Sequence, residues 1–148
     1  MSTTAALYDS DYQAWLDANI DLLKRSRFQE LDVEHLIEEM ADMGKKDRAE
    51  LANRLVVLIA HLLKWQYQPA HRSSNWRGSI VEQRVQIQRN LRLSPSLKSY
   101  LQQAIEDAYP DALEIATQET GLPVSTFPAG CSYHAEQLLD KAFWPDAD

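Results

Sequence analysis

The chain has 148 residues, 45% of them hydrophobic and 25% charged, which is the composition of a folded domain with one core and excludes a disordered chain. Its formal net charge of -7 at pH 7 disfavours nonspecific attraction of the whole molecule to nucleic acid or to an anionic membrane. The first residues lack the features of a signal peptide, the longest apolar run is too short to cross a bilayer, and the single cysteine, Cys131, excludes an internal disulfide, so we expect a soluble cytoplasmic protein.

The first half of the chain predicts three helices. The first covers residues 11–26, because Ser10 and Gln13 have the spacing of a capping box. The second begins after Asp32, a favourable N-cap, and ends at Gly44, a residue type favoured just past a helix end. Its apolar residues fall on one face, as in an amphipathic helix: Val33, Leu36, Ile37, Met40 and Met43. The third runs from about residue 47 to Pro69 and is apolar nearly all round, so we expect it to be the most buried helix.

The second half predicts two long helices and a short one. A fourth helix follows Ser73-Ser74 and reaches about residue 93, with an apolar stripe of Trp76, Ile80, Ile87 and Leu91. A fifth opens with Ser94-Pro95 and ends at Gly121, and Pro110 inside it is expected to kink or split it. After an irregular segment, residues 123–131, a short helix lies near residues 134–141, and residues 143–145 are expected to dock on the body.

The chain contains four glycines and no alternation of apolar and polar residues bounded by turns, so no strand is predicted. We therefore predict an all-α fold, a compact helical bundle of five main helices plus a short C-terminal helix. The whole chain, residues 1–148, is predicted to form a single helical domain.

Charge is unevenly placed along the chain. Residues 51–98 contain eight cations and one acid, whereas the remainder is strongly acidic. Two cations, Arg77 and Arg84, border the apolar stripe of the fourth helix, where a buried arginine needs a partner, and the second helix offers carboxylates. The candidate site, either a buried ion-pair site or a small-anion site, comprises Arg77, Arg84, Glu38, Glu39, Trp65 and Trp76.

Metal and nucleic-acid binding are alternatives. His35 and Glu39 are four residues apart on one helix face, and His61 lies near the end of the next helix, so these three could supply metal ligands. However, the ordinary interpretation of such histidines is hydrogen bonding to carboxylates. Trp65 and Trp76 lie among cations and could stack on bases, although the acidic remainder of the chain makes nucleic acid an unfavourable partner.

Several motifs occur in order along nearly the whole chain: Tyr8-Asp9, Asp11-Tyr12, Trp15-Leu16, Leu31-Asp32, Glu34 to Met40, Asp42-Met43-Gly44, His61 to Pro69, Trp76-Arg77, Glu82-Gln83-Arg84, Ser94 to Leu97, Glu119 to Pro123, and Phe127-Pro128. In these motifs the sequence resembles the bacterial family of domain of unknown function 29. The resemblance implies a small, soluble, all-helical bacterial protein with no assigned activity and no catalytic residue.

The sequence thus favours a nonenzymatic helical interaction module that needs no cofactor. Its partner is either an unknown protein or a second copy in a homodimer. Two alternatives stay open: a pocket for a small anion or a metal at the corner between the third and fourth helices, and nucleic-acid binding through the basic middle segment.

Overall fold

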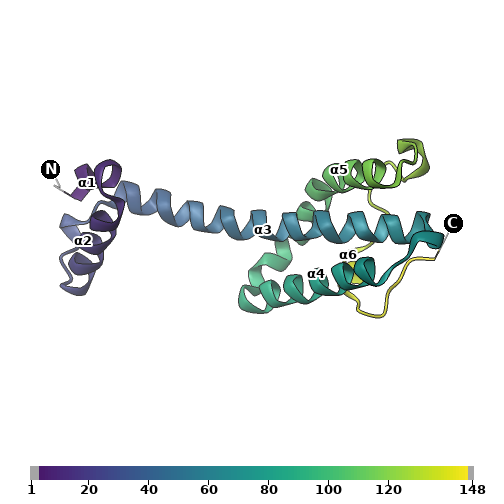
Figure 1. Ribbon diagram of the computed structural model, residues 1–148. Helices are drawn as coiled ribbons and strands as arrows, with labels where there is room; N and C mark the ends of the chain where they lie inside the picture. Colours follow the sequence, from purple (N-terminus) through teal and green to yellow (C-terminus); the bar gives the residue numbers. More distant parts are fainter. Residues whose placement is uncertain (1–3, 147–148) are drawn as a thin grey trace. The chain divides into compact units, whose positions relative to one another are not determined.

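The computed structural model describes residues 4–146 and is all-α, with no strand among these residues (Figure 1). The fold therefore confirms the predicted class. The described residues form two compact units, residues 4–46 and residues 47–146, and each unit is described by itself below. The prediction of a single domain for the whole chain stays a prediction.

The N-terminal unit contains α1 (Thr4–Ser10), α2 (Tyr12–Lys24), a 3₁₀ turn (Phe28–Glu30) and the beginning of α3 (Val33–Tyr67). Helix α1 was not predicted. The predicted cap at Ser10 is wrong, because Ser10 is the last residue of α1 and Asp11 caps α2 instead, accepting a hydrogen bond from the backbone N–H of Ala14 at 3.1 Å. Aspartate is also a favourable N-cap residue, and Asp11 fits the observed helix start.

Helix α3 is one helix of 35 residues where two were predicted. The predicted end at Gly44 is wrong: among the described residues the only glycine in the left-handed conformation is Gly121, so Gly44 has no helix-ending geometry. A glycine inside a helix costs about 1 kcal/mol relative to alanine, which the good helix formers that surround it, such as Lys45 and Lys46, can offset. The total of five longer helices plus a short one is therefore as predicted, but α1 is new and two predicted helices are merged.

The C-terminal unit contains the rest of α3, α4 (Ser74–Leu93), α5 (Leu101–Thr120) and α6 (Ala135–Leu139). Three 3₁₀ segments connect them: Pro69–His71, Pro95–Tyr100 and Val124–Thr126. The predicted helix ends at Pro69 and Gly121 are confirmed, the latter by a left-handed φ of 73°. The predicted split at Pro110 is wrong, because α5 continues through it.

The core of the C-terminal unit combines the apolar faces of α3, α4, α5 and α6. Helix α3 supplies more of these buried residues than any other helix, with Leu51, Leu55, Leu58 and Leu62 fully buried. Trp76 is only half-buried and packs against this core rather than inside it. Phe143 and Trp144 also pack against it, so the predicted docking of the C-terminal segment is confirmed.

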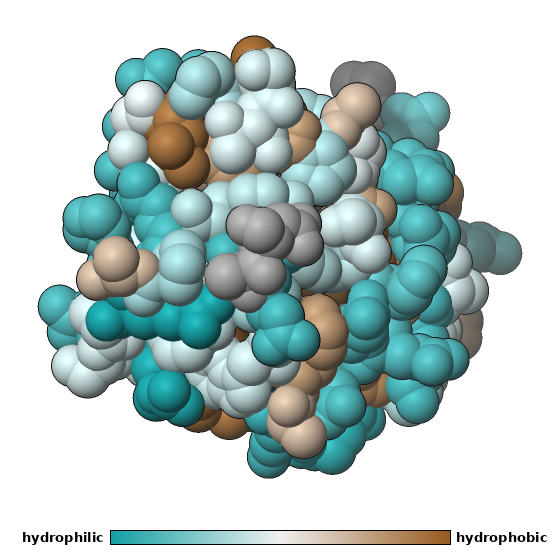
Figure 2. All heavy atoms as spheres, turned by 90° about the vertical axis from the view of Figure 1, so that its right-hand side faces the viewer, coloured by the Kyte–Doolittle hydropathy of each residue, from teal (hydrophilic) through white to brown (hydrophobic). Residues whose placement is uncertain are grey.

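The face of the molecule in Figure 2 is largely hydrophilic, and its hydrophobic residues appear there as small separate areas. Among the described residues, no helix combines the length and the hydropathy that crossing a bilayer requires.

Candidate functional site

The predicted joint between the third and fourth helices is a cluster of cations on indole rings, which we call the cation–indole cluster. Its members are Lys64, Trp65, Arg72, Trp76, Arg77, Arg84 and Trp144. The Trp65 and Trp144 rings lie 4.8 Å apart between centroids, and the Arg77 guanidinium lies 5.1 Å and 4.8 Å from them. Cations at such distances are attracted by the negative face of an indole. The sequence predicts that Trp144 docks on the body of the protein, but it does not predict that Trp144 belongs to this cluster.

Arg84 is the buried cation of the cluster, with 1% of its surface exposed. Its Nε donates to the carbonyl of Leu138 at 2.8 Å, and one terminal nitrogen donates to the carbonyl of Gln137 at 3.1 Å. Beside it, the Gln88 amide donates to the carbonyl of Leu139 at 2.6 Å. These are carbonyls at the C-terminal end of α6, which have no partner inside a helix, so α4 caps α6 through side chains.

The charge of Arg84 is therefore stabilised by carbonyl oxygens and by the Trp144 ring, 5.6 Å away. Burial lowers the pKa of Arg84, and Asp140 opposes that effect. Its other terminal nitrogen, Nη1, is buried without a hydrogen-bond acceptor among the residues that the structure describes. A buried donor of a charged group without an acceptor lowers the stability of the fold, so Nη1 is the unsatisfied donor of this cluster.

Lys64 is buried as well, but it has an anionic partner. Its ammonium pairs with the carboxylate of Glu119 on α5 and lies 5.0 Å from the centre of the Trp76 ring. Arg72 donates to the backbone carbonyl of Trp65 at 2.8 Å. Three cations of the basic segment are thus used inside the C-terminal unit, which leaves fewer of them for an external ligand.

The structure brings together Trp65, Trp76, Arg77 and Arg84 of the predicted site. Glu38 and Glu39 belong to the N-terminal unit, so the predicted pairing of arginines with these carboxylates stays a prediction. The sequence correctly indicated that Arg84 needs partners, but backbone carbonyls at a helix end leave no mark in the sequence pattern.

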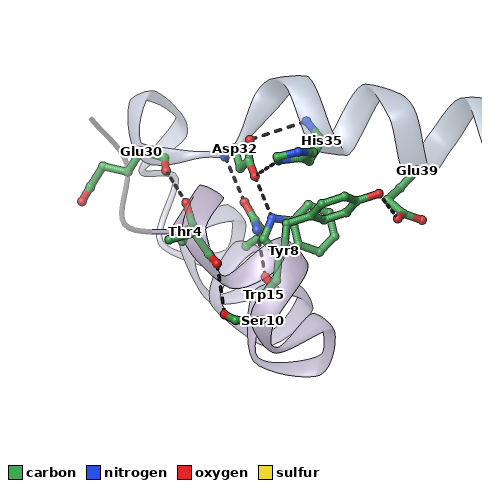
Figure 3. A network of polar contacts seen from close by, with 10 residues as sticks. Thr4, Tyr8, Ser10, Trp15, Glu30, Asp32, His35 and Glu39 are labelled. Atoms are coloured by element: carbon green, nitrogen blue, oxygen red, sulfur yellow. Dashed lines mark hydrogen bonds and ion pairs between the residues drawn. The ribbon is translucent and has the colours of Figure 1, made fainter.

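The N-terminal unit is built around a network of polar contacts at Asp32 (Figure 3). The buried Asp32 carboxylate accepts hydrogen bonds from the Trp15 indole at 2.8 Å and from the His35 ring at 2.6 Å. The Asn19 side chain joins the same network, accepting from the backbone N–H of Asp32 at 3.1 Å and donating to the carbonyl of Trp15 at 2.8 Å. Burial alone would raise the pKa of Asp32, but the hydrogen bonds from Trp15 and His35 outweigh burial and lower it.

Tyr8 attaches α1 to α3 in this network. Its ring stacks on His35 with centroids 3.9 Å apart, and its hydroxyl donates to Glu39 at 2.6 Å (Figure 3). The hydrogen bond raises the pKa of Tyr8 and lowers that of Glu39. The hydrogen bond to Asp32 raises the pKa of His35. These contacts connect α1, α2 and α3. One signal in the sequence pointed to them, because Tyr8, Asp32 and His35 all lie in the motifs that carry the resemblance described above.

The predicted metal ligands have other partners. His35 bonds Asp32, Glu39 accepts from Tyr8, and the ring of His61 lies 2.7 Å from the carbonyl of Val57. In residues 4–146, no group of three His, Cys, Asp or Glu side chains is placed to hold a metal ion. The metal set of His35, Glu39 and His61 stays a prediction, with the Nδ1 atom of each histidine and one carboxylate oxygen of Glu39 bonded to other groups.

The groups that could act as nucleophiles are held in their protonated forms. Cys131 and His134 line a cavity of about 390 Å³ together with Tyr109. Burial raises the pKa of the Cys131 thiol, and burial raises the pKa of Tyr109 to about 12. Since a thiolate rather than a thiol is the reactive form, this cavity has no activated nucleophile.

The largest departure from the predicted packing is an exposed apolar seam on the N-terminal part of α3. We define the apolar seam as Val33, Ile37, Met40 and Gly44, with Leu36 and Met43 along one side. The side chains are largely open to solvent: Val33 is 52%, Ile37 63%, Met40 65% and Met43 58% exposed. This segment is an amphipathic helix, as predicted, but within the N-terminal unit its apolar face does not cover a core.

The described part of the N-terminal unit has few buried side chains, so its exposed seam is a large part of its apolar surface. Of residues 4–46, those that are buried are Thr4, Trp15, Asn19 and Asp32, so Trp15 is the one buried hydrophobic side chain in this described part. A unit of this size with such a small core is marginal unless something else covers its apolar surface. Exposed apolar rows of this kind ordinarily mark interaction sites.

Comparison with known proteins gives one match. The family model described as domain of unknown function DUF29 matches residues 7–144. No curated protein matches the chain, and no solved structure matches it.

Proposed function

The chain belongs to the DUF29 family, and from this premise we propose that it is a nonenzymatic helical interaction module whose docking surface is the apolar seam. One observation carries the proposal: the seam is exposed in a unit whose described residues, 4–46, include a single buried hydrophobic side chain. Covering it would remove apolar surface from water at about 25 cal/mol per Å², which is a driving force for association.

The electrostatics support a module rather than an enzyme. The Tyr8 hydroxyl and the Cys131 thiol have raised pKa values, so neither is activated as a nucleophile. Nucleic acid is a poor candidate partner, because Lys64 and Arg84 of the basic segment are buried and bonded within the fold. The single, half-buried Cys131 fits a reducing cytoplasm, where we place the protein.

The test is photo-crosslinking in cells of the source organism with a benzoylphenylalanine residue at position 37. We expect a discrete crosslinked product from this variant. The matched control carries the same residue at position 85, where Val85 is also exposed but lies on α4, and it should give none. An absence of product from position 37, with the protein folded and present in normal amount, would overturn the docking surface.

A second candidate function, binding of a small anion, has one specific observation in its favour. The Arg77 guanidinium is exposed and rests on two indoles, and among the described residues no carboxylate pairs with it. Titration with inorganic phosphate, followed by tryptophan fluorescence, tests it. A saturable change that Arg77→Ala abolishes would support the site, and an unchanged spectrum would remove it.

A further inference from the structure

We propose that the occupant of the apolar seam is a second copy of this chain, paired antiparallel along α3 about a two-fold axis at the level of residues 38 and 39. The inference rests on the proposed function, because it names the partner of the same surface. It follows from the spacing of the seam, from the different character of its two sides and from the charges at its ends.

The seam has the spacing of a coiled-coil face. Val33, Ile37, Met40 and Gly44 follow one another at intervals of four, three and four residues, which keeps them on one line along a helix. No charged residue interrupts this line between positions 33 and 44. Two copies can therefore meet along it without burying a charge.

An antiparallel pairing matches every layer of the seam. With the axis at residues 38 and 39, Ile37 lies against Met40 of the second copy, and Val33 lies against its Gly44. The absence of a side chain at Gly44 provides the space into which Val33 packs, which gives this residue a use although it ends no helix. Each layer then occurs twice by symmetry, as an isologous interface requires.

The sides of the seam distinguish antiparallel from parallel pairing. One side carries Leu36 and Met43, and the other carries Glu34, Ala41 and Lys45. In an antiparallel pair related by a two-fold axis each side meets the same side of the second copy, whereas in a parallel pair it meets the opposite side. Antiparallel pairing thus places Leu36 beside Met43 of the second copy, and parallel pairing would place apolar residues against charged ones.

Charge supports the same orientation. The part of α3 before Met43 carries four carboxylates, those of Glu34, Glu38, Glu39 and Asp42. It is followed by a stretch of net positive charge that contains Lys45, Lys46, Asp47 and Arg48. Antiparallel copies bring Glu34 to the same side and nearly the same level as Lys45 of the second copy. Parallel copies would align the acidic stretch with itself, and like charges repel.

The N-terminal unit also lacks what this partner supplies. Trp15 is its one buried hydrophobic side chain among the described residues, and pairing would add the seam residues of both copies to its core. The helices α1 and α2 leave the seam open, because Val33, Ile37 and Met40 are exposed and Tyr8 contacts α3 at His35 and Glu39, off the seam. A seam of about three helical turns is short, so we expect association at roughly micromolar concentration.

The first experiment is sedimentation velocity from roughly 1 to 200 µM. The wild-type chain should shift from monomer to dimer over this range, and Met40→Glu should remain monomeric at every concentration. Val81→Glu is the matched control, because Val81 is exposed on α4 outside the seam, and it should dimerise like the wild type. Circular dichroism checks that all three chains keep their helix content.

The second experiment tests orientation with two single-cysteine proteins, Val33→Cys and Gly44→Cys, each also carrying Cys131→Ser. Mixed and oxidised, they should form a disulfide between the two different variants, while Val33→Cys alone should stay largely uncrosslinked. A disulfide of Val33→Cys with itself would show a parallel pair and overturn the proposed register.

Two results together would overturn the second copy as occupant: a wild-type chain that stays monomeric at all concentrations, and the absence of a mixed disulfide between the two cysteine variants. The proposed function would survive that result if position 37 crosslinks to a different protein in cells. A product at position 37 that contains only peptides of this chain would support both proposals.

Discussion

The interiors of the two units of this protein are stabilised by different interactions. Among the described residues, the C-terminal unit buries a hydrophobic core that comes from four helices and from Phe127 and Tyr133 in the connecting segments. In the described part of the N-terminal unit, a single indole is buried among hydrogen-bonded polar groups, and the apolar seam is left in solvent. Hydrophobic burial grows with area, whereas each hydrogen bond adds a net of only about 1 kcal/mol. We therefore expect the C-terminal unit to be the more stable of the two, and the N-terminal unit to depend on a few polar contacts and on the partner that covers its seam.

The largest difference in stability is expected between substitutions in the two parts of α3. Leu58→Ala removes a fully buried side chain and should cost about 2–5 kcal/mol of unfolding free energy. Ile37→Ala, at an exposed seam position, should cost less than about 0.5 kcal/mol in dilute, monomeric protein. Urea unfolding at low protein concentration measures both. Equal losses of unfolding free energy would mean that the seam is already covered within the monomer. The two units would then not differ in how they bury apolar surface.

Arg84→Met should come next, with a loss of about 3 kcal/mol, because it removes the donor to the buried carbonyl of Leu138 and one of the two donors to the carbonyl of Gln137, whose other donor is the backbone N–H of Asp140. The matched control is Arg77→Met, since Arg77 is exposed and contacts indole faces only. It should lose less than about 1 kcal/mol. Thermal and urea unfolding give these values. A similar small loss for both variants would show that the polar contacts of Arg84 are as dispensable as the surface ones.

Asp32→Ala should destabilise the N-terminal unit by about 2 kcal/mol, because it removes the acceptor of one buried and one partly buried hydrogen bond. Hydrogen exchange reports it locally: protection of residues 12–24 should fall, and protection of residues 101–120 should not change. Asp21→Ala is the control, since its ion pair with Arg25 lies on the surface and contributes little. Unchanged protection of residues 12–24 would refute the role of the polar network.

The smallest effect is a dependence on pH. The pKa of His35 is raised in the folded chain by its hydrogen bond to Asp32, above the ordinary 6.5. Its contribution to stability is therefore complete below pH 6.5 and is lost as the pH rises through the raised value. Asp32, whose pKa is lowered, loses its contribution only when the pH falls below its ordinary 3.8. Protection of residues 12–24 should thus decrease above pH 6.5, and His35→Gln should flatten the profile. A flat wild-type profile would contradict this.

Local signals in the sequence predicted most of the C-terminal unit. Pro69 cannot continue a helix, Gly121 adopts the left-handed conformation, and an apolar α3 has to be buried, so each boundary follows from a single residue type. Gly44 and Pro110 show the limit of such signals. Each disfavours a helix at one position, but its neighbours favour it, and the helix continues.

The candidate site was less accessible from sequence, for two physical reasons. Periodicity shows that Val33, Ile37 and Met40 share a face, but it cannot show whether another element covers that face. The composition of the basic segment indicated that Arg84 needs oxygen partners, but those partners are backbone atoms far along the chain, and every residue carries a carbonyl.

The cap on α6 has a consequence for the order of folding. A helix of five residues cannot persist alone in water, because nucleation costs more than so few hydrogen bonds return. We therefore expect helix α6 to form only after α4 has presented Arg84 and Gln88 to its last carbonyls. Trp144 follows α6 in the chain, so we expect its contact with Trp65 to form late as well.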